Sequence, residues 1–514
     1  MCQTPAVGAA SDLRNLSDLV AAAAQRRPDA TALVQVGLAG RHSVTWAELE
    51  ADVAAAAAGL AALGLHAGDR VAISLSNTTA FVVAYFGALR AGIVAMPLNT
   101  SLTQHEVSDL LEKSGARVLL CDQSSLHAAE EAVAGTHRVL VDPAGFDAVV
   151  GAGRAHPVRA STHGGEDLAV LLFTSGTSGQ PRGAMLSHRA LMANHDQALS
   201  LHPEPMTEDD VVLLVLPLFH VYGLNSGLGM LARTGATGVL VDRFDPQTTL
   251  SIVRDEHVTN IPGAPPMFQA WARDPDLAAG LASVRLLLSG AAPLPPAARD
   301  AIAAATGVVV QEGYGLTETA PALTTTMASA VPKAGSVGRP LPGVELRLVD
   351  ELGGEVDESD TGEVTVRGAN LFSGYWPGGV EGPDDQGWWR TGDVGYLDGD
   401  GDLFLVDRRK ELVLVSGFNV YPREVEDVLA QHPSVREVAV IAVPDEQTGE
   451  AVKAIVVAEA GSGLTVDDVL GWSRERLARF KTPTVVELVA TLPHSVTGKV
   501  AKGRLREEAG REPT

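Results

Sequence analysis

Residues 173–183 read Phe-Thr-Ser-Gly-Thr-Ser-Gly-Gln-Pro-Arg-Gly, a run in which hydroxyl side chains alternate with glycines and one cation, Arg182, comes near the end. Glycine has no Cβ, so it lets the backbone approach a phosphate closely and accepts positive φ angles. Backbone N–H groups and hydroxyls can then wrap a polyphosphate, to which Arg182 adds positive charge. Because the same residue types dominate ordinary surface loops, this stretch alone supports phosphate binding and a plain loop about equally.

The composition points to a large globular protein. At 514 residues the chain is too long for one ordinary core, so we expect at least two domains. Its 46% hydrophobic content excludes global disorder, and its net charge of -24 argues against sequence-independent nucleic-acid binding. The two cysteines, Cys2 and Cys121, form neither a disulfide framework nor a metal-ligand spacing, and Met1–Asp12 lacks the features of a secretory signal. We therefore expect a cytoplasmic protein.

The most apolar window, Ala80–Pro97, has nearly the length of a membrane span. However, Arg90 lies inside this window, Gly92 interrupts it and Pro97 ends it. A buried helix that runs into a buried strand fits this pattern better than a span. We expect no integral membrane segment.

The first part of the chain alternates between helical and strand patterns. Thr45 and Glu48 have the spacing of a capping box, so a helix is expected to run from there to Leu63 and to end at Gly64. Short apolar strands are expected at 69–75, 117–122 and 169–173, with helical segments between them. This βαβ alternation predicts the α/β class, with parallel sheets covered by helices. The strand at 169–173 leads directly into the glycine- and hydroxyl-rich stretch.

The pattern changes from about Val331. Short alternating strands such as 345–349 and 363–367, separated by Gly/Asp turns, predict a β-rich subdomain within the large N-terminal domain. The charged cluster Arg408–Lys410 marks a plausible boundary, and the last hundred or so residues have the pattern of a small α+β domain. We therefore predict an N-terminal domain at 1–407 and a C-terminal domain at 408–514.

Several familiar motifs are absent from the sequence. Gly498-Lys499 lacks the upstream glycine of a Walker loop, and neither a zinc-type histidine pair nor a nucleophile elbow is found. The run Asp398–Asp402 imitates a calcium-binding loop, but its sixth position is Leu403 and its twelfth is Arg409, where such loops carry glycine and glutamate. We interpret this run as a turn.

Four further segments combine polar chemistry with glycine. Tyr314–Glu318 sets a hydroxyl beside a carboxylate, and Trp389–Asp393 places an acid after a glycine, where it can accept two hydrogen bonds from a ribose diol. Asp407–Gly417 runs from a charged cluster to a glycine, and Thr497–Lys499 carries a lone lysine. Taken singly, turns, a solvated charge cluster and an exposed lysine explain the last three segments at least as well.

Together, in this order and spacing, the segments resemble the adenylate-forming superfamily, which includes acyl-CoA synthetases, 4-coumarate–CoA ligases, luciferases and the adenylation domains of peptide synthetases. The resemblance covers essentially the whole chain, from Thr45 to Lys499. Its motifs are specific, because the phosphate loop and the four segments rarely coincide in other proteins. The resemblance implies a large domain that binds ATP and the acyl group, followed by a small mobile domain.

The reaction implied by the resemblance has two halves. A carboxylate oxygen attacks the α-phosphorus of ATP and expels pyrophosphate, and a coenzyme A thiolate then attacks the acyl-adenylate and expels AMP. The first half brings one anion against another, so neutralising charge is its main physical requirement. ATP, Mg²⁺ and coenzyme A are therefore the implied ligands.

The resemblance also assigns the nucleotide contacts. Thr317 is expected to contact the α-phosphate, Glu318 to hold Mg²⁺, Asp393 to accept from the ribose hydroxyls, and Arg408 to lie beside them. The β- and γ-phosphates are assigned to Thr174, Ser175, Gly176, Thr177, Ser178, Gly179 and Arg182. The adenine and the acyl pocket are assigned to Gly290, Ala291, Ala292, Glu312, Gly313 and Tyr314.

Five residues are assigned to catalysis and coenzyme A binding. Lys499 matches the lysine that bridges carboxylate and phosphate oxygens during adenylation, and Lys410 matches the hinge about which the small domain rotates. Rotation would withdraw Lys499 and bring Gly417 to the pantetheine tunnel. Arg243 matches a basic coenzyme A contact, and His220 matches a gate beside the carboxylate.

One residue departs from the family pattern. The phosphate loop of the family usually ends Pro-Lys-Gly, whereas this chain has Arg182 at the lysine position. The charge is kept, but the point-like ammonium becomes a planar fork. We expect activity to tolerate this change, with the γ-phosphate contact most affected.

The acid substrate is left open between two classes. No amine-binding aspartate follows Phe219, and the Glu351–Gly362 region is short, so coenzyme A ligation is favoured over loading of a carrier domain. The expected pocket residues are apolar or small, which favours a fatty acid; they are Val221, Tyr222, Gly223, Leu224, Ser226 and Gly227. The run His220–Ser226 also resembles 4-coumarate–CoA ligases, so an aromatic acid is the alternative, and a non-catalytic nucleotide-binding relative is a third.

Overall fold

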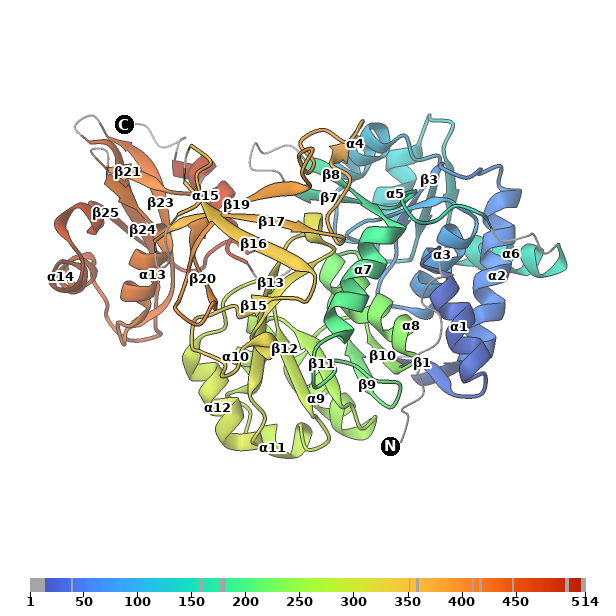
Figure 1. Ribbon diagram of the computed structural model, residues 1–514, viewed down its shortest axis with the longest axis horizontal. Coiled ribbons are helices and arrows are strands. Elements are labelled where there is room, and N and C mark those ends of the chain that lie inside the picture. The colour runs from blue at the N-terminus through green and yellow to red at the C-terminus, as the bar shows by residue number, and fades with distance from the viewer. Residues whose placement is uncertain are drawn as a thin grey trace.

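The computed structural model describes residues 14–37, 40–156, 161–175, 181–350, 352–356, 360–408, 411–415, 418–445, 448–494 and 499–509. Two mixed sheets with flanking helices form most of the molecule, and a four-stranded antiparallel sheet lies between them and a smaller C-terminal part at one end (Figure 1). The predicted α/β class, with a large N-terminal domain and a small C-terminal one, is confirmed. The exact boundary at 407 stays a prediction.

The first large sheet has seven strands in the order β18-β8-β7-β4-β3-β5-β6. Strands β3 to β7 are parallel to one another. At one edge, β8 pairs antiparallel with β7, and β18 pairs antiparallel with β8. The strands are β3 (Arg70–Ser74), β4 (Val94–Pro97), β5 (Val118–Cys121), β6 (Val139–Val141), β7 (Leu168–Ser175), β8 (Pro181–Ser187) and β18 (Tyr375–Trp376). Most of β3 and all of β4 and β5 are buried, as expected for a parallel sheet covered on both faces.

The second large sheet has nine strands in the order β15-β14-β13-β12-β11-β9-β10-β1-β2. Its central strands, from β13 to β1, are parallel, so their carboxyl ends share one edge. The strands are β1 (Thr31–Gly37), β2 (Gly40–Thr45), β9 (Val211–Leu214), β10 (Thr237–Val241), β11 (Asn260–Gly263), β12 (Leu286–Ser289), β13 (Val310–Gly315), β14 (Ala322–Thr325) and β15 (Arg339–Pro340). Strand β13 begins at Val310 and contains the Glu312–Tyr314 motif itself.

The helices of the large part pack on these sheets and on one another. The predicted capping box is confirmed at the start of α2, where the Thr45 side chain accepts from the Glu48 N–H and the Glu48 carboxylate accepts from the Thr45 N–H. The helices are α1 (Asp18–Arg26), α2 (Trp46–Ala62), α3 (Thr79–Arg90), α4 (Gln104–Ser114), α5 (Leu126–Val133), α6 (Pro143–Ala155), α7 (His188–Leu199), α8 (Met230–Thr234), α9 (Pro246–Asp255), α10 (Pro265–Trp271), α11 (Leu277–Gly280) and α12 (Pro296–Thr306).

The most apolar window forms the buried helix α3 and leads into the buried strand β4, as predicted. Arg90, only 8% exposed, ends α3, and its Nη2 atom donates to Glu50 Oε2 at 2.9 Å and to Ser17 O at 2.9 Å. These bonds satisfy the one charge inside the apolar window. Among the described residues, no helix combines the length and the apolar character that crossing a membrane requires.

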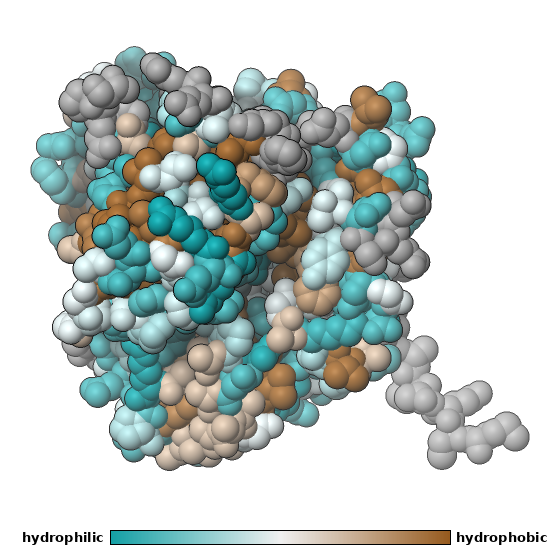
Figure 2. Space-filling view, turned by 90° about the vertical axis from the view of Figure 1, so that its left-hand side faces the viewer, coloured by the Kyte–Doolittle hydropathy of each residue, from teal (hydrophilic) through white to brown (hydrophobic). Residues whose placement is uncertain are grey.

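The β-rich subdomain is a four-stranded antiparallel sheet of β16 (Val344–Val349), β17 (Gly362–Gly368), β19 (Trp388–Leu397) and β20 (Leu403–Arg408). The C-terminal part contains a five-stranded sheet and three helices: β21 (Val413–Val415), β22 (Phe418–Val420), β23 (Val435–Asp445), β24 (Gly449–Ala458), β25 (Val485–Val489), α13 (Pro422–Ala430), α14 (Val466–Arg476) and α15 (Lys502–Ala509). Helix α13 packs on β23 and also against β20 of the subdomain. Figure 2 looks onto the C-terminal side, where hydrophobic areas are interrupted by hydrophilic side chains.

Candidate active site

The candidate site is assembled at the carboxyl edge of the nine-stranded sheet. His220 follows β9, Arg243 lies on an exposed bend after β10, and Gly290 follows β12. Tyr314 lies near the end of β13. Ligands of α/β proteins characteristically bind at this edge, because the loops that leave parallel strands gather there. The geometry therefore groups segments that are far apart in the sequence.

The glycine- and hydroxyl-rich stretch is the connection of the β7–β8 hairpin. Thr174 pairs with Arg182 and Ser175 with Pro181, so the last described residues on each side face one another across the ladder. The Thr174 hydroxyl donates to the carbonyl of Arg182 at 3.4 Å. The assigned phosphate contacts Gly176, Thr177, Ser178 and Gly179 lie outside the described residues, so their role stays a prediction.

Arg182 is held at the end of this hairpin by two side chains of the 375–381 segment. Its guanidinium carbon lies 3.6 Å from the centre of the Tyr375 ring, and its Nη2 lies 2.9 Å from Glu381 Oε1. Such stacking suits a guanidinium because it is planar and weakly hydrated. Glu381 is 70% exposed, so this ion pair is screened by water and weak.

Glu318 lies just after β13, in the short 3-10 turn Thr317–Thr319. Its carboxylate is 7% exposed, and Oε1 accepts a hydrogen bond of 2.7 Å from the Tyr375 hydroxyl. Burial raises the pKa of Tyr375 above its ordinary value, and the neighbouring Glu318 carboxylate raises it further, so the hydroxyl stays protonated and donates. Thr317, assigned to the α-phosphate, is half-buried beside Glu318.

Asp393 is joined to Tyr314 across two sheets. The Tyr314 hydroxyl donates to Asp393 Oδ2 at 2.6 Å, and the Asp393 N–H donates to Thr391 Oγ1 at 3.1 Å. The pairing of β17 with β19 shifts here, and Gly392 has a φ of +79°. This bulge re-aims the side chains next to it. Strand pairing places the backbone of Arg408 directly opposite Asp393.

The loop after β12 presses on an aromatic ring. A Cβ added at Gly290 would lie 2.9 Å from Tyr222 Cε1, so the ring needs glycine there. The Tyr222 hydroxyl donates to the carbonyl of Leu288 at 3.2 Å. Ala291 has a φ of +73°, in the left-handed region that L-residues rarely adopt, and is followed by Ala292. The strained backbone marks this turn as a shaped part of the site.

Glu312, in the neighbouring strand β13, holds the same loop in place. It is 8% exposed, and its Oε2 accepts from the Leu294 N–H at 3.2 Å. Burial raises the pKa of this carboxyl, while Arg299 and Arg423 lower it. Gly313, next in the strand, pairs with Thr325 of β14. The contact with Leu294 gives Glu312 a role in shaping the loop wall, within the segment assigned to the adenine and acyl pocket.

A π-helix, η1 (Tyr222–Gly229), follows the turn after β9. Asn225 anchors it, because its Nδ2 donates to the carbonyls of Leu191 at 3.0 Å and Ala320 at 2.7 Å. His195 Nε2 lies 3.1 Å from the Asn225 carbonyl. A π-helix widens one turn and is frequent at functional sites. Through Ala320, this one is tied to the turn that carries Glu318.

His220 and Lys499 come together although they belong to opposite ends of the molecule. Burial, with a smaller contribution from the nearby Lys499 ammonium, lowers the pKa of His220 to about 4. The Tyr222 N–H donates to His220 Nδ1 at 3.3 Å, so the neutral ring carries its proton on Nε2. Lys499 itself is exposed. At neutral pH this corner therefore holds one fixed cation beside an uncharged donor.

Ion pairs anchor α15, the helix that begins three residues after Lys499. Lys502 Nζ, at the start of α15, lies 2.8 Å from Glu426 Oε1 and 3.3 Å from Glu411 Oε2. Arg506 Nη2 lies 3.4 Å from Glu411 Oε1. These contacts tie α15 both to α13 and to residue 411, next to the predicted hinge. Lys410 and Gly417 lie outside the described residues, and their assigned roles stay predictions.

Two histidines in the core give the fold a testable pH dependence. Burial lowers the pKa of His188 and of His195 to about 4, while the unfolded chain protonates both near pH 6.5. The unfolded state therefore binds more protons between these values, and stability falls as pH drops through that window. We expect the pair to lower the free energy of urea unfolding by about 4 kcal/mol between pH 7 and pH 5.

The matched variant is His188→Asn, which keeps an acceptor for the Leu16 N–H that now donates to His188 Nδ1 at 3.0 Å. It should reduce by about one the number of protons taken up on unfolding, and so make the free energy of unfolding depend less steeply on pH. An unchanged slope would show that His188 does not supply this part of the acid sensitivity.

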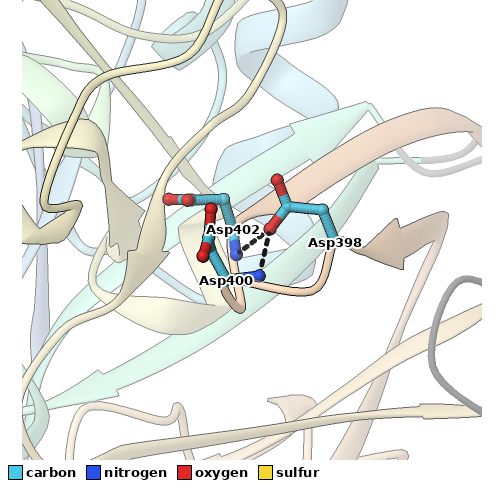
Figure 3. Close-up of side chains that lie close together, drawn as sticks. All are labelled: Asp398, Asp400 and Asp402. Atoms are coloured by element: carbon cyan, nitrogen blue, oxygen red, sulfur yellow. Dashed lines mark hydrogen bonds between the residues drawn. The ribbon is translucent and has the colours of Figure 1, made fainter.

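The Asp398–Asp402 run is a tight turn between β19 and β20, as predicted, and its three carboxylates lie close together (Figure 3). Their oxygens lie within 4.8 Å of one another. The Lys333 ammonium lies 2.5 Å from Asp398, 2.6 Å from Asp400 and 3.1 Å from Asp402. A lysine thus supplies the positive charge that the cluster needs, and the turn pins residue 333 to the four-stranded sheet.

Sequence reasoning missed Tyr375 and Glu381. Neither stands in a pattern of charge or glycine spacing that singles it out, and their partners Arg182 and Glu318 are remote in sequence. The available signal was the run Leu371–Trp376, in which aromatic side chains surround Gly374. This composition is equally typical of a core strand.

Comparison with known proteins gives a consistent set of relatives. The profile described as AMP-binding enzyme matches residues 20–376, and the one described as AMP-binding enzyme C-terminal domain matches 424–499. A feruloyl-CoA synthase of an Amycolatopsis species is 38% identical over 492 residues, covering 95% of this chain and 97% of that protein. A long-chain-fatty-acid–CoA ligase of Bacillus subtilis is 31% identical over 533 residues, covering 96% and 94%.

The structural comparison also distinguishes two states of one relative. Crystal structures of MatB from Rhodopseudomonas palustris are 33% identical to this chain, and each covers 97% of this chain and 99% of MatB. The TM-score is 0.88 for the ATP-bound form and 0.76 for the apo form. The arrangement of this chain is therefore nearer to that of the ATP-bound protein.

Proposed function

The chain belongs to the AMP-binding enzyme family, and from this premise we propose that it is an ATP-dependent ligase that joins an apolar carboxylic acid to coenzyme A. Its activity class is that of an AMP-forming acid–thiol ligase, like the feruloyl-CoA and fatty-acid relatives. A carboxylate oxygen bonds to the α-phosphorus of ATP and pyrophosphate leaves. The thiolate sulfur of coenzyme A then bonds to the acyl carbon and AMP leaves.

One observation carries the proposal: the Lys499 ammonium is near enough to His220, which follows β9 at the carboxyl edge of the sheet, to lower the pKa of that histidine. The reaction drives one anion against another, and a cation placed between them stabilises the charge that develops. A lysine on a separate domain can supply this cation for one half-reaction and withdraw for the other. The neutral His220 offers a donor to the carboxylate without adding a second charge.

The nucleotide would lie between the three sheets. Asp393 accepts the ribose hydroxyls, Thr317 contacts the α-phosphate, and Arg182 meets the outer phosphates at the mouth of the hairpin. Exposed Arg243 is available to coenzyme A. A carboxylate accepts strong hydrogen bonds from a vicinal diol, and Arg is suited to phosphate oxygens. These roles make the first half-reaction a matter of positioning and charge.

Magnesium fits the acidic residue of this site. Glu318 is a buried carboxylate whose Oε1 is oriented by the Tyr375 hydroxyl, and Mg²⁺ typically takes one or two protein carboxylates and completes its shell with phosphates and water. When bound, the ion neutralises phosphate charge. Glu318 would hold it.

The residues in and next to the π-helix limit the class of acid that the site is suited to bind. Val221, Gly223 and Leu224 are buried, and η1 contains no cationic side chain that could pair with a second carboxylate of the substrate. We propose a fatty acid as the substrate class. An aromatic acid is the second candidate, because the Tyr222 ring packed under Gly290 offers a flat wall and the feruloyl relative is 38% identical.

The test is acid-dependent exchange of pyrophosphate into ATP, followed by AMP release on addition of coenzyme A. The panel contains C2–C18 fatty acids, benzoates and cinnamates. We expect exchange with at least one apolar acid and coenzyme A-dependent AMP release with the same acid. Exchange without acyl transfer would reject the ligase proposal, and ATP binding without any exchange would indicate a non-catalytic relative.

A further inference from the structure

We propose that Tyr375 is a positioning residue that joins the two halves of the ATP phosphate site, with its ring holding Arg182 and its hydroxyl holding Glu318. The inference rests on the proposed function, because it takes Arg182 as a phosphate contact and Glu318 as the metal-binding carboxylate. It assigns to one aromatic side chain the geometry of both groups.

The backbone around Tyr375 bridges the two large sheets. The Phe372 N–H donates to the Glu318 carbonyl at 2.9 Å, and the Ser373 N–H donates to the Met185 carbonyl at 2.8 Å. Strand β18 then pairs with β8, with Tyr375 opposite Ala184. The segment is thus bonded on one side to the residue that would hold the metal. On the other side it is bonded to β8, the strand that contains Arg182.

The Tyr375 ring itself is fixed from behind. The Phe372 ring meets it edge-on with centroids 5.0 Å apart, and the Trp389 ring meets Phe372 in the same way at 5.1 Å. Phe372 is 1% exposed and Trp389 9% exposed, so this aromatic row belongs to the core. Edge-to-face pairs of this kind hold ring orientation. A ring anchored in the core can impose a fixed geometry on groups that touch its outer face and its hydroxyl.

The two contacts of Tyr375 act on different parts of its partners. The hydroxyl bond of 2.7 Å engages Oε1 of Glu318 and so fixes the rotation of that carboxylate. The ring face, 3.6 Å from the Arg182 guanidinium carbon, fixes the plane of the cation. The exposed Glu381 only balances the charge of Arg182, and polyphosphate can replace it there. Removing the hydroxyl should therefore affect the metal side alone, whereas removing the ring should affect both sides.

The test measures ATP binding by calorimetry, once in EDTA and once with excess Mg²⁺. In Tyr375→Phe we expect the dissociation constant for ATP in EDTA to stay within twofold of that of wild type. The factor by which Mg²⁺ lowers this dissociation constant should become about tenfold smaller. In Tyr375→Leu, binding in EDTA should also weaken about fivefold, because the cation–π contact is lost. In pyrophosphate exchange, Tyr375→Phe should need about tenfold more Mg²⁺ for half-maximal rate and keep its rate at saturating Mg²⁺.

Two controls separate positioning from stability. Tyr396→Phe removes a hydroxyl from a ring that stacks on Phe404 with centroids 5.0 Å apart, and it should match wild type in every measurement. Adding Tyr375→Leu to Arg182→Gln should weaken binding in EDTA no further than Arg182→Gln alone. A purely structural Tyr375 would lower the melting temperature and leave the Mg²⁺ dependence unchanged.

The outcomes separate this inference from the proposed function. An active wild-type enzyme whose Tyr375→Phe variant keeps the normal effect of Mg²⁺ on ATP binding overturns the inference alone. Equal behaviour of the Phe and Leu variants in EDTA also overturns it, because the ring would then hold nothing. A wild-type protein that binds ATP with the expected variant pattern but exchanges no pyrophosphate with any acid overturns the proposed function alone.

Discussion

Replacing Lys499 by alanine is expected to lower acid-dependent pyrophosphate exchange at least about a hundredfold, because one preorganised charge or donor at a developing anion contributes a factor of that size. Transfer of the acyl group from a supplied acyl-adenylate to coenzyme A should largely survive. Lys499 lies beside His220 in the arrangement described, and the second half-reaction is expected to use a different orientation of the C-terminal domain. The two half-reactions are measured separately, by isotope exchange and by thioester formation.

The matched control is Lys481→Ala, which removes another cation of the C-terminal part, one whose Nζ lies 2.6 Å from Glu424 Oε1. It should leave both half-reactions near wild type. An independent readout is the His220 resonance in NMR, since removal of the Lys499 charge should raise the pKa of His220 from about 4. Equal loss of both half-reactions in Lys499→Ala would refute this division of labour.

Local sequence patterns predicted those features whose cause is local. The capping box at Thr45 and Glu48, the α3–β4 pair around Arg90 and the Asp398–Asp402 turn all follow from neighbouring residues. The family motifs brought Lys499 and His220 into one hypothesis, and the Lys499 charge is near enough to lower the pKa of His220, while the roles of both residues stay predictions. Each of these predictions needed only a short window or a recognised motif.

The features that the sequence did not predict depend on contacts between remote segments. Tyr375 acquires meaning only because Arg182 and Glu318, far away in the chain, lie at its ring and its hydroxyl. The π-helix likewise depends on the bonds from Asn225 to Leu191 and Ala320. Helix propensity contains no term for such partners, so local sequence patterns do not predict this π-helix.

The second large effect is expected at Asp393. Its Oδ2 already accepts from Tyr314, and a carboxylate has about four acceptor sites on its two oxygens, so it retains the capacity to accept from a ribose diol. Two hydrogen bonds to a charged acceptor are each worth about 1.5–3 kcal/mol, so Asp393→Ala should raise the KM for ATP about a hundredfold or more. The rate at saturating ATP should fall much less, because the bonds are the same in the ground and transition states.

The nucleotide itself supplies the decisive comparison for Asp393. With 2′,3′-dideoxy-ATP, wild type should lose about the same hundredfold in KM, whereas Asp393→Ala should lose nothing further, because the diol and the carboxylate act as one pair. Tyr314→Phe isolates the contribution of the 2.6 Å bond that orients the carboxylate, and it should cost only about tenfold. If Asp393→Ala still distinguishes ATP from its dideoxy analogue as strongly as wild type does, the ribose contact belongs to another residue. Arg408, paired with Asp393 across the ladder, would be the next residue to substitute.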